Sequence, residues 1–346
     1  MIRKLFLTLF SFILAVAIVG GAAFWLQEDS VTQKLSITTE YILEVPSGST
    51  PNALFSRLES EGLIQGAFWL RLHWRLNYQG KNLHVGEYRL TPGMDVKQVI
   101  DKWLRGDIVQ YKVTLVEGHN IRQIRAALAA NEHITQTLGD VSNAELMERL
   151  GKRGVHPEGQ FFPDTYQFTK GQTDFELLKQ AHQRLEKVLA QEWEQRADNL
   201  PLKTPYEALV LASIIEKETG VPSERSEIAG VFVRRLNKGM RLQTDPTVIY
   251  GMGERYQGRI RSADLKEATA YNTYLIQGLP PTPIAMVGRE AIHAALHPKE
   301  GRSLFFVAKG DGSHYFSETL SEHNKAVREY QLRRRSDYRS SPASTE

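Results

Sequence analysis

The chain has 346 residues, of which 41% are hydrophobic and 24% are charged, values that are ordinary for globular proteins and exclude bulk disorder. Its length accommodates two folded domains beyond a targeting segment. The net charge is only +3 and the basic residues are scattered, so a nucleic-acid partner is not expected. There are no cysteines, which excludes disulfides, thiolate metal sites and cysteine nucleophiles.

A membrane-spanning helix is predicted at the N-terminus. Basic residues within 1–4 precede an uncharged, mostly apolar run at 5–26, which at ~1.5 Å per residue just crosses a ~30 Å hydrocarbon core. Glu28 and Asp29 follow the run, so the positive-inside rule places residues 1–4 in the cytoplasm and the rest of the chain outside. A cleaved signal peptide is the alternative, although the run is longer than the ~7–15 residue core of a typical signal.

A polar stalk is predicted at 27–41, and a strand–turn–helix unit then occurs three times. Each unit ends a strand, turns at a glycine and begins an amphipathic helix. The glycines are Gly48, Gly93 and Gly118, and the predicted N-cap residues are Thr50, Asp95 and Asn120. Side-chain oxygens at N-caps accept hydrogen bonds from the free backbone N–H groups of the first turn.

The first two units and the aromatic-rich segment at 67–78 form a predicted compact α+β module at 42–107. The module resembles a LysM-like carbohydrate-binding fold. Phe68, Trp69 and Trp74 could be platforms for sugar rings or ordinary core residues.

A buried helix is predicted between Thr204 and Gly220. Thr204 is a natural N-cap, Pro205 fits the first helical position, and Glu207 stands three residues after the cap, which completes a capping box. Gly220 is the expected stop. The body of the helix at 208–215 is almost entirely apolar, so burial on most sides is expected.

Two acids, Glu216 and Glu218, fall in the last turn of this helix. Partial burial and the negative end of the helix dipole disfavour a carboxylate, so both raise its pKa toward the range of a proton donor. On a helical wheel Glu218 has bulkier apolar neighbours than Glu216. Alternatively, both acids are solvated and pair with Lys217 or a nearby arginine.

The second predicted domain covers 108–330 and is rich in loop motifs, and a polar tail is predicted at 331–346. Several residues offer the amide, hydroxyl, carboxylate and aromatic groups that bind sugar hydroxyls and stack on pyranose rings. These binding candidates are Glu158, Tyr166, Gln243, Thr244, Asp245, Thr247, Tyr271, Asn272 and Tyr274. Ordinary turn chemistry is the alternative. The segments 304–309 and 314–317 predict a β-hairpin.

Five motifs follow the predicted anchor in a fixed order. They are Glu-Gly-Gln-Phe-Phe-Pro-Asp-Thr-Tyr at 158–166, Ala-Ser-Ile-Ile-Glu-Lys-Glu-Thr at 212–219, Arg-Leu-Gln-Thr-Asp-Pro-Thr-Val-Ile-Tyr-Gly-Met-Gly at 241–253, Ala-Tyr-Asn-Thr-Tyr at 270–274 and Gly-Leu-Pro-Pro at 278–281. Together they resemble the YceG-like family of endolytic murein transglycosylases, over almost the whole chain. In that family the catalytic acid is the second glutamate of Ile-Ile-Glu-Lys-Glu, which matches Glu218.

The resemblance implies cleavage of the MurNAc–GlcNAc bond without water. An acid protonates the bridging oxygen, the MurNAc 6-hydroxyl attacks the anomeric carbon, and the product ends in 1,6-anhydro-MurNAc. One carboxyl group suffices as acid and then base, because the nucleophile belongs to the substrate. A hydrolytic muramidase would need a second carboxylate ~5–5.5 Å or ~6.5–9.5 Å away, for which Asp164, Asp245 and Glu158 are the candidates.

The resemblance also implies a fold and a place in the cell. The expected fold is α+β: an N-terminal transmembrane helix, the small LysM-like module and a larger catalytic domain. The enzyme would be a single-pass inner-membrane protein whose periplasmic domain cuts nascent glycan strands, terminates their elongation and works with peptidoglycan synthases. A catalytically silent, membrane-anchored peptidoglycan-binding scaffold is the alternative, in which Glu218 merely caps a helix.

No cofactor and no metal are predicted. His293 and His297 have the i, i+4 spacing of a zinc site, and His314 or His323 could supply a third ligand. However, no glutamate lies inside the pair and Pro298 follows it directly, which favours a histidine at a helix end.

Overall fold

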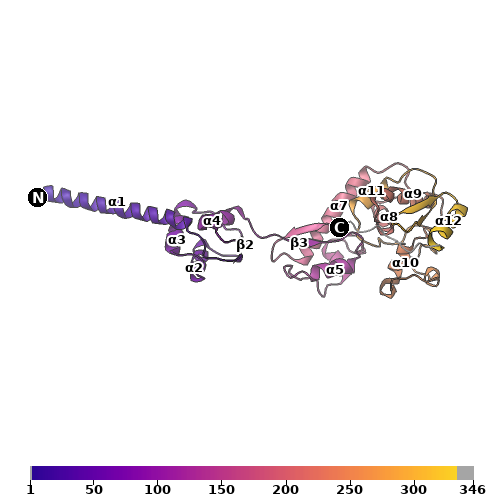
Figure 1. The fold of residues 1–346 in the computed structure, drawn as a ribbon, viewed down its shortest axis with the longest axis horizontal. Coiled ribbons are helices and arrows are strands. Elements are labelled where there is room, and N and C mark those ends of the chain that lie inside the picture. The colour runs from indigo at the N-terminus through magenta and orange to yellow at the C-terminus, as the bar shows by residue number, and fades with distance from the viewer. Residues whose placement is uncertain (1, 333–346) are drawn as a thin grey trace. The chain divides into compact units, whose positions relative to one another are not determined.

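The computed structural model describes residues 2–332 and contains helices and short antiparallel strands, so the predicted α+β class is confirmed (Figure 1). The chain divides into two compact units. The first contains Met1–Tyr111 and Gln167–Gly171, and the second contains Lys112–Tyr166 and Gln172–Glu346. From residue 333 onward, the predicted polar tail lies outside the described residues.

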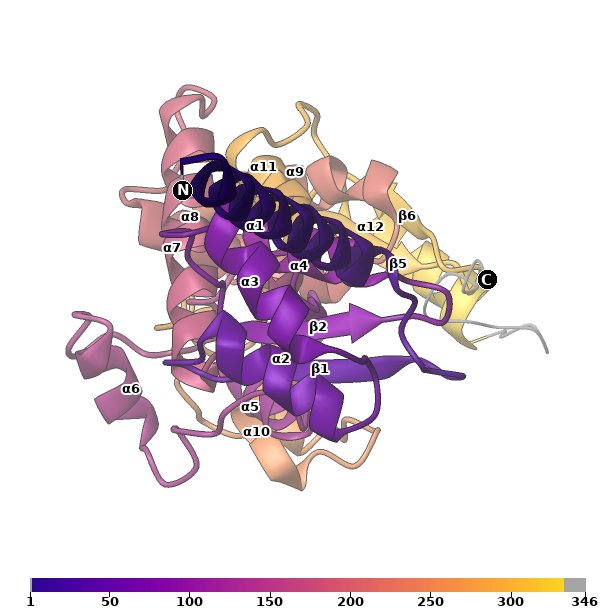
Figure 2. The same cartoon turned by 90° about the vertical axis from the view of Figure 1, so that its left-hand side faces the viewer.

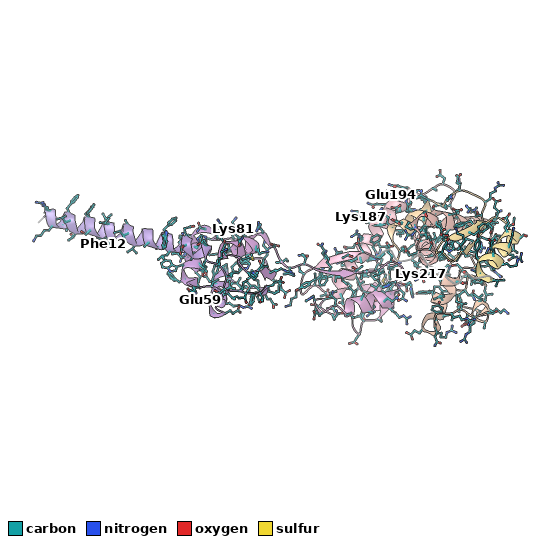
Figure 3. The ribbon with its side chains drawn as sticks, viewed as in Figure 1. Phe12, Glu59, Lys81, Lys187, Glu194 and Lys217 are labelled. Carbon is teal, nitrogen blue, oxygen red and sulfur yellow. The ribbon has the colours of Figure 1, made fainter. Side chains whose placement is uncertain are left out.

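The first unit begins with helix α1 (Ile2–Thr32), which is long and apolar enough to cross a membrane. Its apolar side chains before residue 26 are largely exposed, and Figure 3 labels one of them, Phe12, on a stretch of α1 that no other element covers. The helix does not end where the predicted stalk begins. Gln27, Ser30 and Val31 share one helical face and are buried, because this face packs against helix α3.

The rest of the first unit surrounds one two-stranded sheet. Strand β1 (Tyr41–Val45) pairs antiparallel with β2 (Gly86–Leu90), and Figure 2 shows this sheet together with α2 (Pro51–Ser60) and α3 (Ala67–Asn77). Helix α4 (Val96–Arg105) completes the core. Of the three aromatic residues named above, Trp74 is buried, Trp69 is half-buried and Phe68 is exposed.

The repeated strand–turn–helix units are confirmed. Gly48, Gly93 and Gly118 all have positive φ, between 73° and 87°, which glycine adopts without a steric cost. Thr50, Asp95 and Asn120 are the N-caps of α2, α4 and α5 (Ile121–Ala129), and each side chain accepts a hydrogen bond from a backbone N–H of the first turn.

The second unit is built around α8 (Pro205–Glu218), in which every residue from Ala208 to Ile215 is buried. Figure 1 shows α8 among its neighbours α7 (Asp174–Glu194), α9 (Arg225–Asn237) and α11 (Arg289–Leu296). A helix that is apolar on all sides has no face to offer to water, so burial at the centre of the unit follows from its sequence.

Shorter elements complete the second unit. They are α6 (Asn143–Arg149), α10 (Asp245–Met252), α12 (Leu320–Val327), and the strands β5 (Phe305–Ala308) and β6 (His314–Ser317). Strand β3 (Tyr111–Thr114) pairs with β4 (Thr165–Phe168), and each of these two strands has residues in both units. The antiparallel register of β5 and β6 confirms the predicted hairpin.

The ends of α8 differ in detail from the prediction. Thr204 caps the helix by accepting the Glu207 N–H at 3.2 Å. The Glu207 carboxylate accepts the backbone N–H of Lys203 rather than that of Thr204, so the capping box is not closed. At the other end, Thr219 is extended, with φ −143°, and the helix ends without the glycine stop predicted at Gly220.

Candidate active site

Glu218 is the last residue of α8 and lies in an open cavity of about 830 Å³. The cavity is lined from several elements: Arg235 of α9, the loop residues Leu242, Gln243 and Thr244, Asp245 of α10, Tyr274, and parts of the β5–β6 hairpin and α12. The apolar body of α8 holds the Glu218 carboxyl close to the core. Burial raises the pKa of Glu218 to about 7, so the group can donate and accept a proton near neutral pH.

Thr244 makes the direct contact with Glu218. Its hydroxyl donates a hydrogen bond to Oε1 of Glu218. Thr244 is itself fixed, because its backbone N–H donates to Oγ1 of Thr273 at 3.1 Å and its carbonyl accepts from Oγ1 of Thr247 at 2.8 Å. A hydrogen bond to the carboxylate favours the ionised form, so Thr244 lowers the pKa of Glu218 against the larger effect of burial.

Two charged neighbours act on Glu218 in opposite directions. The negative charge of Asp245 raises the pKa of Glu218, and the positive charge of Arg235 lowers it. Arg235 is buried, and its N–H groups donate to the carbonyls of Leu242 and Leu304, each at 2.7 Å. Because these carbonyls engage the guanidinium, Arg235 holds the cavity walls together and forms no salt bridge with Glu218.

The predicted binding residues Gln243, Asp245 and Tyr274 line the same cavity as Glu218. The hydroxyl of Tyr274 donates to Oδ1 of Asp245 at 2.7 Å. Gln243 is exposed and has a φ of 51°, a left-handed conformation that is costly for a residue other than glycine. Such strain is common where a backbone is shaped around a ligand.

The predicted binding residues Glu158 and Tyr271 lie in a second cavity of about 490 Å³. Glu158 is 1% exposed, and its carboxyl group accepts hydrogen bonds from the backbone N–H of Ile121 and the hydroxyl of Tyr250, both at 3.0 Å. Burial outweighs these bonds and raises the pKa of Glu158 to about 7.

Three other predicted binding residues line neither of these two cavities. Each is at most 2% exposed, and its polar side-chain atoms form hydrogen bonds inside the protein: Tyr166, Thr247 and Asn272. The Tyr166 hydroxyl donates to the Phe162 carbonyl at 2.7 Å, and the Asn272 amide donates to backbone carbonyls, the shortest bond being 2.7 Å to Glu267. These internal hydrogen bonds satisfy the buried polar groups, and the predicted contact of the three residues with substrate stays a prediction.

The three carboxyl groups nominated as the second carboxylate of a muramidase lie in different places in the structure. Asp164 pairs with Arg184 away from the cavity, and Glu158 belongs to the second cavity, so Asp245 is the one nominated partner that shares a cavity with Glu218. Glu216 accepts the Gly288 N–H at 3.2 Å and its Oε1 lies 3.8 Å from Nη2 of Arg225. These contacts tie the end of α8 to neighbouring segments.

The histidines considered as zinc ligands fall into two groups. His293 and His297 lie near Glu192, and the potential ligand atoms of these three residues are within 4.8 Å of one another. The Glu192 carboxylate is already bound to Nη1 of Arg289 at 2.5 Å and Nδ1 of His293 at 2.9 Å. His314 and His323, the suggested third ligands, instead line the cavity of Glu218.

Arg235 lines the cavity of Glu218 but is not among the residues predicted from the sequence motifs. The sequence does indicate that Arg235 is buried, because it continues at helical spacing the apolar stripe of Ile228, Val231 and Phe232. An arginine on a buried face must find several acceptors, which marks the position as one that organises its surroundings.

Known proteins resemble this chain over most of its length. A sequence model of the YceG-like family matches residues 43–329. A relative from Bacillus subtilis (strain 168) named endolytic murein transglycosylase is 32% identical over 336 residues, which covers 90% of this chain and 91% of the relative. A protein of the same name from Streptococcus pneumoniae (strain D39) is 26% identical, and the match covers 83% of this chain but only 57% of that relative. A crystal structure of a YceG-like protein from Listeria monocytogenes has a TM-score of 0.54 and 30% identity, over 84% of this chain and 99% of that one.

Proposed function

The chain belongs to the YceG-like family, and from this premise we propose that it is an endolytic murein transglycosylase whose catalytic acid is Glu218. One observation carries the assignment of the acid: a carboxyl group with a pKa of about 7 lines an open cavity of about 830 Å³. Glycosidic bond cleavage needs an acid of this kind, protonated near neutral pH and within reach of a polysaccharide.

The proposed reaction uses Glu218 twice. Glu218 first gives its proton to the oxygen that bridges MurNAc and GlcNAc, and the bond from that oxygen to the anomeric carbon breaks. The 6-hydroxyl of the same MurNAc forms the new bond to the anomeric carbon. Its proton passes to the Glu218 carboxylate, so the acid is restored, no water is consumed and the product ends in 1,6-anhydro-MurNAc.

The neighbours of Glu218 support this cycle. A group that is acid and then base works best when its pKa lies close to the working pH. Burial and Asp245 raise the pKa of Glu218, whereas the Thr244 hydroxyl and Arg235 lower it, and the balance is about 7. The Thr244 bond also orients the carboxyl group, so Thr244 is proposed as a positioning residue and Gln243, Asp245 and Tyr274 as substrate-binding residues.

The position of Asp245 is also compatible with a second mechanism, hydrolysis by two carboxyl groups. Because it shares the cavity with Glu218, it is the residue that would act as the second carboxylate of a hydrolytic muramidase. Its hydrogen bond from Tyr274 and its place in the first turn of α10 give it other partners. The lyase mechanism is therefore the one proposed, and hydrolysis is the outcome that would replace it.

The remaining parts of the proposal concern the place of the enzyme in the cell. We propose that residues 5–26 of α1 anchor the protein in the inner membrane with residues 1–4 in the cytoplasm, and that residues 108–330 act in the periplasm. The module at 42–107 is proposed to be LysM-like. An anchored enzyme would cut glycan strands near the membrane, where synthases extend them, and so terminate their elongation.

The test is mass spectrometry of purified peptidoglycan treated with the full-length protein or with its Glu218→Gln variant. Internal fragments that end in anhydro-MurNAc, and that the variant does not form, are expected. Reducing ends would show hydrolysis and direct attention to Asp245. If neither protein cleaves the strands and both bind them, the chain is a peptidoglycan-binding scaffold.

A further inference from the structure

Three elements that line the cavity of Glu218 also contribute residues to the second cavity. Helix α10 contributes Asp245 to the first cavity and Pro246, Ile249 and Tyr250 to the second. The loop after it contributes Tyr274 to the first and Tyr271 to the second. At the end of α8, Glu218 lines the first cavity and the adjacent residue Lys217, labelled in Figure 3, lines the second. The end of α8, α10 and the loop with Tyr271 and Tyr274 therefore each contribute residues to both cavities.

The second cavity has aromatic walls and a buried acid. The rings of Tyr250 and Tyr271 pack edge to face with centroids 4.8 Å apart, and the half-buried Tyr256 adds a third aromatic surface. Aromatic side chains with polar groups nearby suit the apolar faces and hydroxyl groups of a pyranose ring. The Tyr250 hydroxyl is fixed on Glu158, so this part of the wall is rigid.

The cavity also carries exposed positive charge. Nζ of Lys217 donates to the Gly118 carbonyl at 3.1 Å, which leaves two further N–H donors on the ammonium group. Lys217 is exposed, and it takes part in no salt bridge among those in the described part of the chain. An ammonium group in this setting suits a carboxylate ligand, and the peptides on murein carry carboxylates.

We infer that the second cavity is a distal subsite for the same strand, where a saccharide packs on Tyr256 and the carboxylate of its peptide meets Lys217. The inference rests on the proposed function, since it takes murein as the ligand. Binding at a distance from the cleaved bond holds the strand across the active site, and an enzyme that cuts inside a strand needs such a hold on both sides of the cut.

Binding is measured in the Glu218→Gln background, where no cleavage interferes. Full-length protein in nanodiscs is titrated with labelled glycan strands that keep their peptides. Adding Tyr256→Ala is expected to weaken binding about tenfold, the equivalent of ~1.4 kcal/mol, because the aromatic surface is lost. Tyr256→Phe keeps the ring and should bind as the parent does. Tyr315→Ala removes a half-exposed tyrosine outside both cavities and is the matched control.

Lys217→Gln tests the charge. It is expected to weaken binding of strands with peptides and to leave binding of peptide-free strands unchanged. The subsite is refuted if Tyr256→Ala binds as tightly as the parent, or if Tyr315→Ala weakens binding equally. Equal effects of Lys217→Gln on both strands refute the peptide contact. These results do not depend on catalysis, so a failure of the proposed lyase activity is recognised separately by the product analysis.

Discussion

Removal of the Thr244 hydroxyl is expected to raise the pKa of Glu218 and to extend activity to higher pH. The hydroxyl donates to Oε1 of Glu218 and so stabilises the carboxylate. A hydrogen bond to a charged group contributes ~1.5–3 kcal/mol, and 1.36 kcal/mol corresponds to one pKa unit. Glu218 is only half-buried, so the lower end of this range applies. Thr244→Val should therefore raise the pKa of Glu218 by ~1 unit from its value of about 7.

The sign of the effect on activity follows from the role of Glu218 as an acid. Activity requires the protonated form at the start of the cycle, so the rate falls as pH rises through the pKa of Glu218. In Thr244→Val the alkaline limb of the pH–rate profile should move up by ~1 pH unit. The maximal rate should also fall, because the carboxyl group loses the bond that orients it.

The assay is the initial rate of glycan-strand cleavage between pH 5 and pH 9. Thr244→Ser keeps the hydroxyl and is the matched control, so its alkaline limb should coincide with that of the unmodified protein. An unchanged limb in Thr244→Val would refute the tuning of Glu218 by Thr244. An equal shift in Thr244→Ser would show that packing, and not the hydroxyl, sets the pKa.

Three further changes test the charges and the fold. Asp245→Asn removes a negative neighbour of Glu218, so the alkaline limb of the same profile should move down, and an upward shift would contradict this. The folded-state pKa of Glu158 is about 7, so the stability that its protonated form provides is lost as pH rises from 4.5 through 7. The melting temperature of the unmodified protein should therefore fall over this pH range relative to that of Glu158→Gln, by an amount equivalent to up to ~3 kcal/mol of folding stability. Parallel plots of melting temperature against pH for the two proteins would refute this effect of Glu158. Gly159→Ala places a Cβ 2.5 Å from Cβ of Pro283 at a φ of 73°. Urea denaturation should show a loss of ~2–4 kcal/mol, and a loss below ~1 kcal/mol would mean that Pro283 can move.

Local features of the fold could be predicted from the sequence because their causes lie within a few residues. The N-caps Thr50, Asp95 and Asn120 each satisfy the first turn of the helix that follows them. The burial of α8 follows from its unbroken apolar body. The end of α1 could not be predicted in this way, because Val31 and the residues around it are buried by α3, which begins more than 30 residues later in the sequence.

The site could be predicted only in part because its contacts join distant segments. The end of α8 marked Glu218 as a candidate acid, but nothing in the sequence pairs it with Thr244, which lies beyond α9 in the loop before α10. Loop chemistry selected Thr247 and Asn272 as binding residues, yet composition cannot tell a polar group that faces a cavity from one that holds a loop together. Both side chains are buried and form hydrogen bonds within the protein.

The two acids at the end of α8 show how contacts with other elements determine the chemistry of similar residues. Burial raises the pKa of both Glu216 and Glu218. Glu216 accepts the Gly288 N–H and faces Arg225, so its lone pairs are used within the protein. Glu218 has a hydroxyl as its hydrogen-bond partner and lines the open cavity. The nearby Arg235 donates to backbone carbonyls rather than to Glu218. A carboxyl group that is buried enough to hold its proton, yet paired with no cation, is the one that can deliver that proton to a substrate.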